Sequence, residues 1–297
     1  MPARVHALLV VRPDGRTPAA HHLRRTLAGL ADQTRRVDAL TIVVCGDDEG
    51  VAAVAAASGA ESVISAPAST GFAAATAMAT LRVNGDAVWL LAQDTAPEPE
   101  ALARLAGALE RAPSVAFVAP KLVRWDDRTE IVSLGVSMTT FGRTVGLADA
   151  ELDQGQHDGR EDVLGSDIRG VLARTDAWRD LGGIDRALAG ADEGLDLGVR
   201  ARLAGARVLL VPTALVAVSG DGVAGPPSPL TGPRRRRRAF AGQAGQRVDR
   251  QFLRRRQPAQ PVGRLSAVQP LGSSSAAQQR RKRFITQVGQ RRFVMCQ

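Results

Sequence analysis

The sequence predicts an α/β fold in which a Rossmann-like, mostly parallel sheet is flanked by helices, followed by a disordered basic tail. Three observations support this prediction. Short apolar runs alternate with segments whose apolar residues recur at helical spacing. Turn-forming residues, mainly Gly, Pro and Asp, separate these segments. Beyond residue 233 the composition becomes rich in Arg, Gln and Ser, without any periodicity.

Each expected strand of the first half is a short apolar run. HALLVV at 6–11 ends just before Pro13, and LTIVVC at 40–45 ends before a Gly-Asp-Asp turn. ESVIS, AVWLL and VAFVA complete the set at 61–65, 87–91 and 115–119. Strands that are apolar on both faces are typical of a parallel sheet covered on both sides.

The expected helices lie between these strands. In 19–30, three leucines at helical spacing share one face, while two arginines lie on another. The segments 51–57 and 70–81 are rich in alanine. The segment 98–111 begins with a glutamate, whose charge suits the positive end of the helix dipole.

The second half of the folded part is less regular. Its expected elements are a hairpin, a polar loop, a short strand, a helical turn, a helix and two strands separated around Pro212. The hairpin is expected at 131–136 and 141–145, the polar loop at 151–162, and the short strand at 170–174. The helical turn follows at 175–181, the helix at 195–203, and the two strands at 207–211 and 214–218.

Charge is divided unevenly along the 297 residues. The chain has 39 Lys and Arg against 30 Asp and Glu, yet 17 of the basic residues and only one acid lie at 233–297. The first 232 residues therefore carry 22 basic and 29 acidic side chains, a net charge of −7 against +9 for the whole chain. The excess of positive charge belongs to the tail, and we do not expect the folded part to bind nucleic acid.

Other protein classes are excluded by composition. Two cysteines, Cys45 and Cys296, cannot form a disulfide framework or a four-cysteine zinc site. Aromatic residues make up 3% without any Tyr, which argues against a stacking surface for single-stranded nucleic acid. No signal peptide is apparent, and no apolar run reaches the roughly 20 residues of a spanning helix. We therefore expect a cytoplasmic protein.

These patterns predict one folded domain at 1–220, with halves at 1–119 and 120–220, and a Gly/Pro linker with a disordered Arg-rich tail at 221–297. The tail leaves three interpretations open. It holds the protein peripherally at the anionic inner face of the plasma membrane, it binds RNA without sequence preference, or it is the product of a shifted reading frame.

Acidic residues follow three of the expected strands. Asp14 follows the first strand, Asp47 and Asp48 follow the second, and Asp94 follows the fourth. Ligands of parallel α/β sheets bind beyond the carboxyl ends of the strands, which places these acids at one candidate binding edge. Asp is also a common turn former, and this alternative stays open for each of them.

Longer segments of the chain are similar to a known family. They are WLLAQDTAPEPEALARL at 89–105, GVLARTDAWRDLGGID at 170–185 and LDLGVRARLAGARVLLVPTALV at 195–216. Together with two shorter blocks that lie between them in the expected order, they resemble actinobacterial family-2 glycosyltransferases of the GT-A fold. The resemblance runs from about residue 4 to residue 219.

This resemblance implies transfer of a sugar from a nucleotide-diphosphate sugar to a hydroxyl of a glycan or lipid-linked acceptor, in the synthesis of cell-envelope glycan. It also implies a divalent cation, Mg²⁺ or Mn²⁺, which neutralises the charge that develops on the leaving diphosphate. A carboxylate near the acceptor then removes the proton of the attacking hydroxyl.

Carried onto this sequence, the strand-end Asp-x-Asp pattern of the family falls on Ala92-Gln93-Asp94, which makes Asp94 the candidate ligand of the metal and the donor. The acidic pair of the family falls on Glu193-Gly194, and we name Asp192 and Glu193 as the candidate catalytic residues. The alternatives are a plain helix cap for Asp94 and a solvated helix start for the other two.

Further contacts to the nucleotide sugar are expected from both halves. These residues are Pro13, Asp47, Asp48, Gly71, Asp196 and Arg200. Asp196 and Arg200 lie four residues apart, so a helix-surface ion pair explains them equally well. His157, with its neighbours Asp153 and Asp158, is a second candidate metal site.

Three positions depart from the family pattern. Ala92 and Gly194 stand where acids are expected, and Ser219 stands near the expected position of a histidine. The alternative function is therefore a non-catalytic or decayed GT-A-like domain that binds nucleotide sugar weakly or not at all.

Overall fold

The computed structural model describes residues 2–13, 18–142, 144–148, 151–159, 161–188, 190 and 192–219. Asp14 and the expected linker and tail at 221–297 lie outside these residues, so the boundary at 220 stays a prediction. Within the described ranges, no helix is both long enough and apolar enough to cross a membrane.

Strands and helices alternate through the first half, as the sequence predicts. The strands are β1 (Val5–Val11), β2 (Ala39–Cys45), β3 (Ser62–Ala66), β4 (Ala87–Ala92), β5 (Thr95–Pro97), β6 (Val115–Arg124), β7 (Glu130–Ser133), β8 (Val136–Met138), β9 (Thr144–Gly146), β10 (Glu151–Leu152), β11 (Asp162–Val163), β12 (Leu172–Arg174) and β13 (Arg207–Val218). The helices are α1 (Ala19–Ala31), α2 (Glu49–Ala56), α3 (Phe72–Ala79), α4 (Ala101–Arg111), α5 (Thr175–Asp180) and α6 (Glu193–Leu203), with 3₁₀ turns at η1 (Thr80–Arg82) and η2 (Arg186–Leu188).

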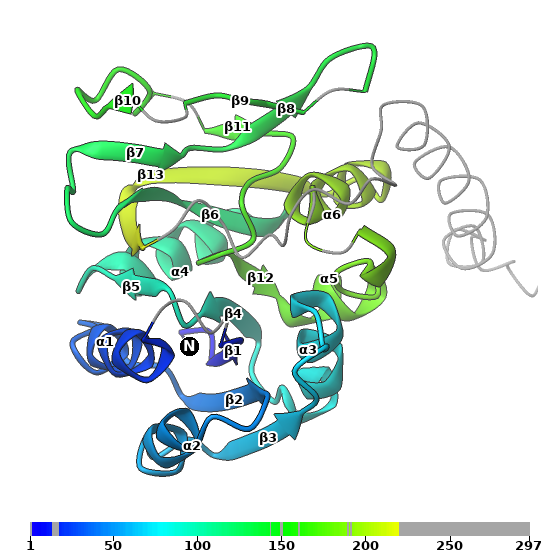
Figure 1. The fold of residues 1–297 in the computed structure, drawn as a ribbon. Coiled ribbons are helices and arrows are strands. Elements are labelled where there is room, and N and C mark those ends of the chain that lie inside the picture. The colour runs from blue at the N-terminus through cyan, green and yellow to red at the C-terminus, as the bar shows by residue number, and fades with distance from the viewer. Residues whose placement is uncertain are drawn as a thin grey trace, which may run out of the picture. The chain divides into compact units, whose positions relative to one another are not determined.

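The centre of the sheet is parallel and buried on both faces. β1 pairs in parallel with β2 and β4, and β2 pairs in parallel with β3. Figure 1 shows α1 and α2 on one side of these strands and α3 on the other. Alternate residues of β1 follow this division, because Leu8 and Val10 pack in the core with α3 while Leu9 and Val11 pack with α1 and α2. The predicted α/β class is confirmed.

One central strand runs antiparallel to its neighbours, and the sequence pattern gave no indication of its direction. The sheet continues from β4 through β12 to β6, and β12 runs antiparallel to both of these neighbours. Leu172 of β12 lies opposite Trp89 on one side and Val118 on the other. β6 then pairs in parallel with β13, so the sheet is mixed but mostly parallel at its centre.

The C-terminal strand is continuous across Pro212. We expected two strands there, because proline cannot donate a hydrogen bond to a neighbouring strand. β13 instead runs from Arg207 to Val218, and its register against β6 shifts between Val211 and Leu215. This irregularity accommodates the proline without ending the strand.

The predicted hairpin is wrong in its pairing. β7 pairs with β6 and β10, while β8 forms a separate two-stranded sheet with β9. Gly135 lies between β7 and β8 with a φ of 74°, and a β-carbon there would lie 2.9 Å from Val163. This left-handed residue turns the chain at the point where the sequence pattern predicts an uninterrupted strand. The expected polar loop also contributes the short strands β10 and β11.

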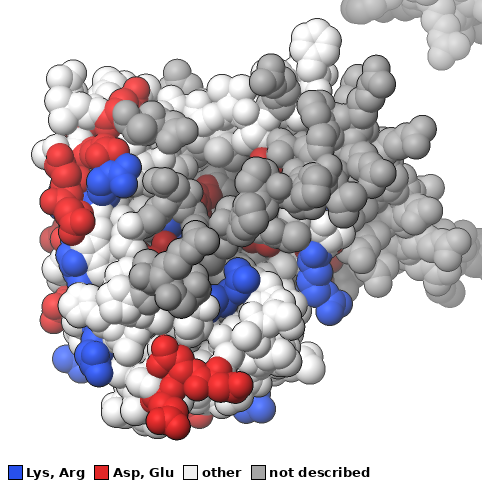
Figure 2. All heavy atoms as spheres, in the orientation of Figure 1, with Lys and Arg blue, Asp and Glu red and all other residues white. Residues whose placement is uncertain are grey.

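Charged side chains are dispersed over the face drawn in Figure 2. In the part of that face formed by described residues, acidic side chains gather at the left edge and the bottom, and basic side chains stand apart from one another. A continuous basic surface of the kind that binds a phosphate backbone is not seen in that part of the view.

Two glycines allow α6 to pack directly against the segment that precedes β12. A β-carbon at Gly194 would lie 1.7 Å from the Ser166 carbonyl oxygen, and one at Gly198 would lie 1.9 Å from the Leu164 carbonyl oxygen. These positions are four residues apart and therefore share one face of the helix. The close contact fixes where α6 begins relative to residues 164–166.

We expect Gly198→Ala to lower the free energy of unfolding by about 1–3 kcal/mol, because the added methyl group must displace backbone atoms. Alanine has a higher helix propensity than glycine, so a loss of stability in this variant would come from packing and not from helix propensity. Gly159→Ala is the matched control, since no atom lies within 4 Å of its β-carbon. Urea denaturation measures both variants, and equal midpoints would contradict the proposed contact.

Candidate active site

The carboxyl ends of β1 and β4 are joined by one side chain. Gln93 follows β4, accepts a hydrogen bond from the Arg12 backbone nitrogen at 2.9 Å and donates one to the Arg12 carbonyl oxygen at 2.9 Å. Val10 lies opposite Ala92 in the parallel ladder, so Arg12 and Asp94 follow at neighbouring positions. Gln93, the central residue of the expected Asp-x-Asp position, therefore holds the two strand ends together.

Asp94 lies at this edge and is engaged by a buried arginine. Its Oδ2 accepts a hydrogen bond from Arg169 Nη1 at 2.8 Å, while its Oδ1 is buried without a hydrogen-bond partner. Burial raises the pKa of Asp94, and the positive charge of Arg169 opposes that rise. The Asp94 carbonyl oxygen also accepts a hydrogen bond from the Ser219 nitrogen at 3.1 Å, so the end of β13 meets the end of β4.

Arg169 is fully buried and links two carboxylates from distant parts of the chain. Asp167 Oδ2 accepts from its Nη2 at 2.8 Å, and Asp167 Oδ1 accepts from its Nε at 3.1 Å. Gly170 positions the arginine, because its nitrogen donates to the Leu90 carbonyl oxygen of β4 at 2.7 Å. Burial acts against the charged form of Asp167, but Arg169 prevails and lowers the pKa of that carboxyl. The Asp94–Arg169–Asp167 triad thus connects the two halves of the domain.

Glu193 begins α6 close to this triad. Burial raises its pKa to about 7, although its Oε1 accepts a hydrogen bond from the Gly190 nitrogen at 3.1 Å. The negative charge of Asp167 raises the pKa further, and the positive charge of Arg12 lowers it. The charge of Asp167 therefore acts on the helix-start acid Glu193, and Arg169 links Asp167 to the strand-end acid Asp94.

Asp192 precedes Glu193 in a strained conformation. Its φ of 56° is left-handed, and among the described residues it is the single residue other than glycine with a positive φ. Its Oδ1 accepts a hydrogen bond from Thr144 Oγ1 at 2.6 Å, which ties the start of α6 to β9. Backbone strain of this kind is common at functional sites and persists where the surroundings impose it.

Gly194, where the family pattern places an acid, has a packing reason. Any side chain there would collide with the Ser166 carbonyl oxygen, so the fold requires glycine. Ala92 is also fully buried, in the apolar core on the α3 side of the sheet. Neither position faces open space in which a carboxylate would be solvated.

The other expected donor contacts are more dispersed. Asp48 caps α2, since its Oδ1 accepts a hydrogen bond from the Val51 nitrogen at 2.9 Å, and Asp47 beside it is exposed. Gly71 caps α3 with open space around its α-carbon, and Pro13 is partly buried after β1. These residues follow the ends of β1, β2 and β3, but no described contact joins them to the Asp94–Arg169–Asp167 triad.

Asp196 and Arg200 form the ion pair that their spacing predicts, but the pair is not a surface feature. Asp196 is 2% exposed and accepts from Arg200 Nε at 2.8 Å. Arg200 also donates to the carbonyl oxygens of Leu181 at 2.7 Å and Gly183 at 2.9 Å. The pair therefore holds the turn after α5 against α6.

The second candidate metal site is wrong. Asp153 and Asp158 both bind the buried Lys121, at 2.8 and 2.7 Å, and His157 pairs with Glu151. These side chains fasten the segment 151–159 to β6 and leave no shared position for an ion.

The side chains at Asp94 also test the expected Mg²⁺ or Mn²⁺. Oδ1 has no hydrogen-bond partner, but Oδ2 binds a guanidinium that already balances the carboxylate. Divalent cations in proteins gather several oxygen ligands. In the part of the chain that the structure describes, no three His, Cys, Asp or Glu side chains are grouped so as to hold a metal ion. These residues therefore do not fit a divalent-cation site.

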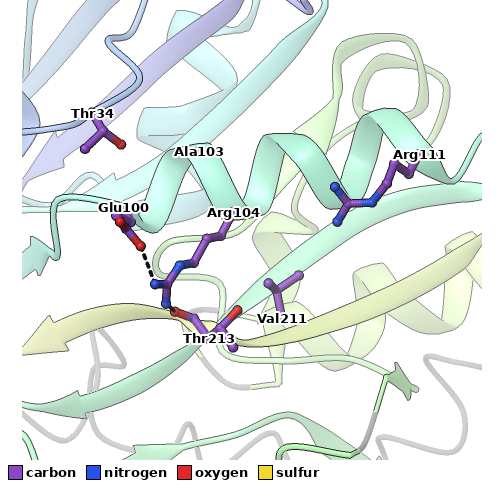
Figure 3. Close-up of a pocket in the computed structure, with 7 residues that line it drawn as sticks. All are labelled: Thr34, Glu100, Ala103, Arg104, Arg111, Val211 and Thr213. Atoms are coloured by element: carbon purple, nitrogen blue, oxygen red, sulfur yellow. Dashed lines mark hydrogen bonds and ion pairs between the residues drawn. The ribbon is translucent and has the colours of Figure 1, made fainter.

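A hollow of about 410 Å³ lies away from the strand ends (Figure 3). Its lining residues are Thr34, Glu100, Ala103, Arg104, Arg111, Val211 and Thr213. Arg104 within it pairs with Glu100 and donates to the Thr213 carbonyl oxygen. None of these residues contacts the triad, so the hollow is not part of the candidate site.

Sequence reasoning did not identify Arg12, Asp167 or Arg169. A signal for the latter two exists, because charged residues alternate in Gly-Ser-Asp-Ile-Arg-Gly, directly before a buried strand. Charged residues between glycines are typical of solvated loops, however, and only the contacts distinguish a buried pair from an exposed one.

We expect Arg169→Met to lower the free energy of unfolding by about 3 kcal/mol, because it leaves two half-buried carboxylates, 14% and 24% exposed, without their counter-charge. Arg207→Met is the matched control, since its ion pair with Asp162 is about 40% exposed on both sides, and such pairs contribute roughly 1 kcal/mol or less. Chemical denaturation at neutral pH compares them. Similar losses in both variants would contradict the role assigned to Arg169.

Glu193 gives stability a defined pH dependence. With a pKa of about 7 against an ordinary value of 4.5, the folded state retains a proton that the unfolded state has lost, so stability falls as pH rises through this window. We expect the stability of Glu193→Gln relative to wild type to be higher at pH 8 than at pH 5 by roughly 3 kcal/mol. Urea denaturation at both pH values measures it. The exposed Glu161→Gln should follow the wild type at both, and identical behaviour of the two variants would refute the assignment.

Known proteins are similar to this chain in sequence family and in fold. The family model described as "Glycosyltransferase like family 2" matches residues 16–242. No curated protein matches the sequence. Among solved structures, one of GalNAc-T7 with UDP, GalNAc and Mn²⁺ has a TM-score of 0.58 at 12% identity and covers 73% of this chain. Two structures of S. aureus TarS, one of residues 1–349, each have a TM-score of 0.50 at 14% identity over 73% of this chain.

These likenesses concern the fold, which is that of the GT-A glycosyltransferases. The chain spans 44% of the GalNAc-T7 chain, 37% of the longer TarS chain and 60% of the shorter one. The family model, by contrast, covers about three quarters of the sequence. The chain therefore belongs to glycosyltransferase-like family 2.

Proposed function

We propose that this protein moves a sugar from a nucleotide-diphosphate sugar to an acceptor hydroxyl, with Glu193 as the general base. The observation that carries the proposal is the buried Glu193 carboxylate beside the charges of Arg12 and Asp167. Family membership supports glycosyl transfer. The UDP in the GalNAc-T7 structure supports a nucleotide-linked donor.

Glu193 has the acidity that this proton transfer needs. A general base works best when its pKa lies near the working pH, and burial gives Glu193 a pKa of about 7. In the proposed step its carboxylate takes the proton of the acceptor hydroxyl, and the oxygen forms a bond to the anomeric carbon. The bond from that carbon to the diphosphate breaks, and the nucleoside diphosphate leaves with the electron pair.

Asp192 has a different part in the proposal. Its carboxylate already accepts a hydrogen bond from Thr144, so we assign it to positioning the start of α6 rather than to taking the proton. The acid–base step at Glu193 is independent of which cation, Mg²⁺, Mn²⁺ or a side chain, neutralises the leaving diphosphate. Donor contacts from Pro13, Asp47, Asp48 and Gly71 stay predictions.

The acceptor and the setting rest on sequence resemblance alone. We propose a glycan or lipid-linked acceptor in cell-envelope synthesis, in a protein of actinobacterial type. We also propose that the Arg-rich tail holds the protein at the inner face of the plasma membrane, where each basic residue contributes about 1 kcal/mol of attraction to anionic lipid.

The alternative is a non-catalytic or decayed domain. Its support comes from Ala92, Gly194 and Ser219, but two of these three departures have packing reasons. The buried Glu193 next to Gly194 supplies a carboxylate one position earlier on the same helix. We therefore favour the enzyme.

We expect the purified protein to hydrolyse or transfer from a UDP- or TDP-sugar, and Glu193→Gln to reduce kcat/KM by about 10²–10⁴-fold. Because the base must be ionised, kcat/KM of the wild type should rise with pH up to about 7 and then level off. Product formation from radiolabelled donors measures both effects. Arg202→Gln, at an exposed ion pair, should behave as wild type. Equal rates for Glu193→Gln and wild type would rule out the assigned base.

A further inference from the structure

The guanidinium of Arg12 has no ion-pair partner among the residues that the structure describes. Its backbone is held on both sides by Gln93, yet its Nε is buried without a hydrogen-bond partner. No ion pair joins its guanidinium to any residue that the structure describes. Arg12 as a whole is half-buried, but a single N–H withdrawn from water without an acceptor is already costly, so a ligand that supplies an acceptor is favoured.

The surroundings show where this guanidinium acts. Its positive charge lowers the pKa of Glu193 at the start of α6 and opposes the burial that raises the pKa of Cys45 at the end of β2. The Arg12 charge thus influences groups at the end of β2 and at the start of α6.

Asp94, by contrast, has a carboxylate oxygen that lacks a hydrogen-bond donor. Its Oδ2 accepts a hydrogen bond from Arg169, whereas its Oδ1 is buried and can still accept one from a ligand. Arg12 follows β1 and Asp94 follows β4, and these two strands pair in parallel with Val10 opposite Ala92, so both residues lie at the same edge of the sheet. One neighbouring pair of strand ends therefore offers one unpaired donor and one unpaired acceptor.

A sugar diphosphate can supply both an acceptor for the Arg12 guanidinium and a donor for Asp94 Oδ1. Phosphate oxygens accept hydrogen bonds from guanidinium groups, often in pairs, and sugar hydroxyls donate to carboxylates. A divalent cation on Asp94 would instead lie close to the Arg169 guanidinium, which binds the same carboxylate at 2.8 Å. The positive charge of the donor site is thus built from arginine side chains.

We propose that Arg12 binds the diphosphate of the donor directly, that Asp94 Oδ1 accepts a hydrogen bond from a donor sugar hydroxyl, and that donor binding consequently needs no divalent cation. This inference rests on the proposed function, because it assigns the diphosphate to the same site.

Calorimetry on the full chain tests it with UDP, TDP, inorganic pyrophosphate and uridine, each in EDTA and in Mn²⁺. We expect the diphosphates to bind in EDTA with an affinity within about twofold of that in Mn²⁺. Arg12→Gln should weaken UDP, TDP and pyrophosphate at least tenfold, about the effect of one charge-assisted contact, and leave any uridine binding unchanged. Arg12→Lys keeps the positive charge but loses the paired N–H donors of the guanidinium, so its affinity for the diphosphates should lie between those of wild type and Arg12→Gln.

Two controls separate binding from folding. Arg111→Gln removes an exposed arginine of α4 and should bind every probe as wild type does. Because Arg12 has no described ion-pair partner, Arg12→Gln should unfold at the wild-type midpoint. If Arg12→Gln proves unfolded, two measurements still test the inference. Wild type in EDTA and in Mn²⁺ tests whether a cation is needed, and Arg12→Lys tests whether Arg12 binds the diphosphate.

The outcomes distinguish this inference from the proposed function. Binding of UDP only in Mn²⁺, or full affinity in Arg12→Gln, overturns the inference and leaves a glycosyltransferase with Glu193 as base. Absence of binding by any diphosphate in either condition overturns both. Cation-independent binding without any sugar transfer would keep the donor site and remove the catalytic proposal.

Discussion

The site depends on one guanidinium that is shared by two carboxylates. Arg169 is wholly buried, and it alone among the described side chains bonds both Asp94, at the end of β4, and Asp167, before β12. Ion pairs of this kind add little stability compared with an apolar replacement, but they fix geometry, because either carboxylate alone would be an uncompensated buried charge. The triad thereby links the end of β4 to the segment before β12, against which α6 packs.

The second constraint is the backbone contact between α6 and residues 164–166. Gly194 and Gly198 remove the side chains that would hold the helix away. One residue along a helix corresponds to a rotation of about 100°, so the face that carries Gly194 differs from the face that carries Glu193, the proposed base. Glu193 is the residue whose carboxylate falls on the side of Asp167 and Arg12. An alignment that matches acids by position alone is therefore displaced by one residue here.

The sequence predicted what is locally encoded and missed what depends on distant contacts. Apolar runs and helical spacing sufficed for β1, β2 and β4, because burial on both faces leaves a direct pattern. The direction of β12 was not predictable, since a short apolar strand looks the same whichever way it runs. Asp94 stood out by its place after a buried strand, whereas Arg169 resembled any charged loop residue until its two partners were known.

The charges at the strand ends also couple donor binding to the strength of the base. Arg12 lowers the pKa of Glu193 in the free protein, because an unpaired positive charge favours the ionised carboxylate. A diphosphate bound to Arg12 would balance that charge and add negative charge of its own, and both effects raise the proton affinity of Glu193. The carboxylate would then be a stronger base when the donor is in place than when it is absent. A stronger base is also more fully protonated at neutral pH, so the rise of the rate with pH would move to a higher pH once the donor is bound.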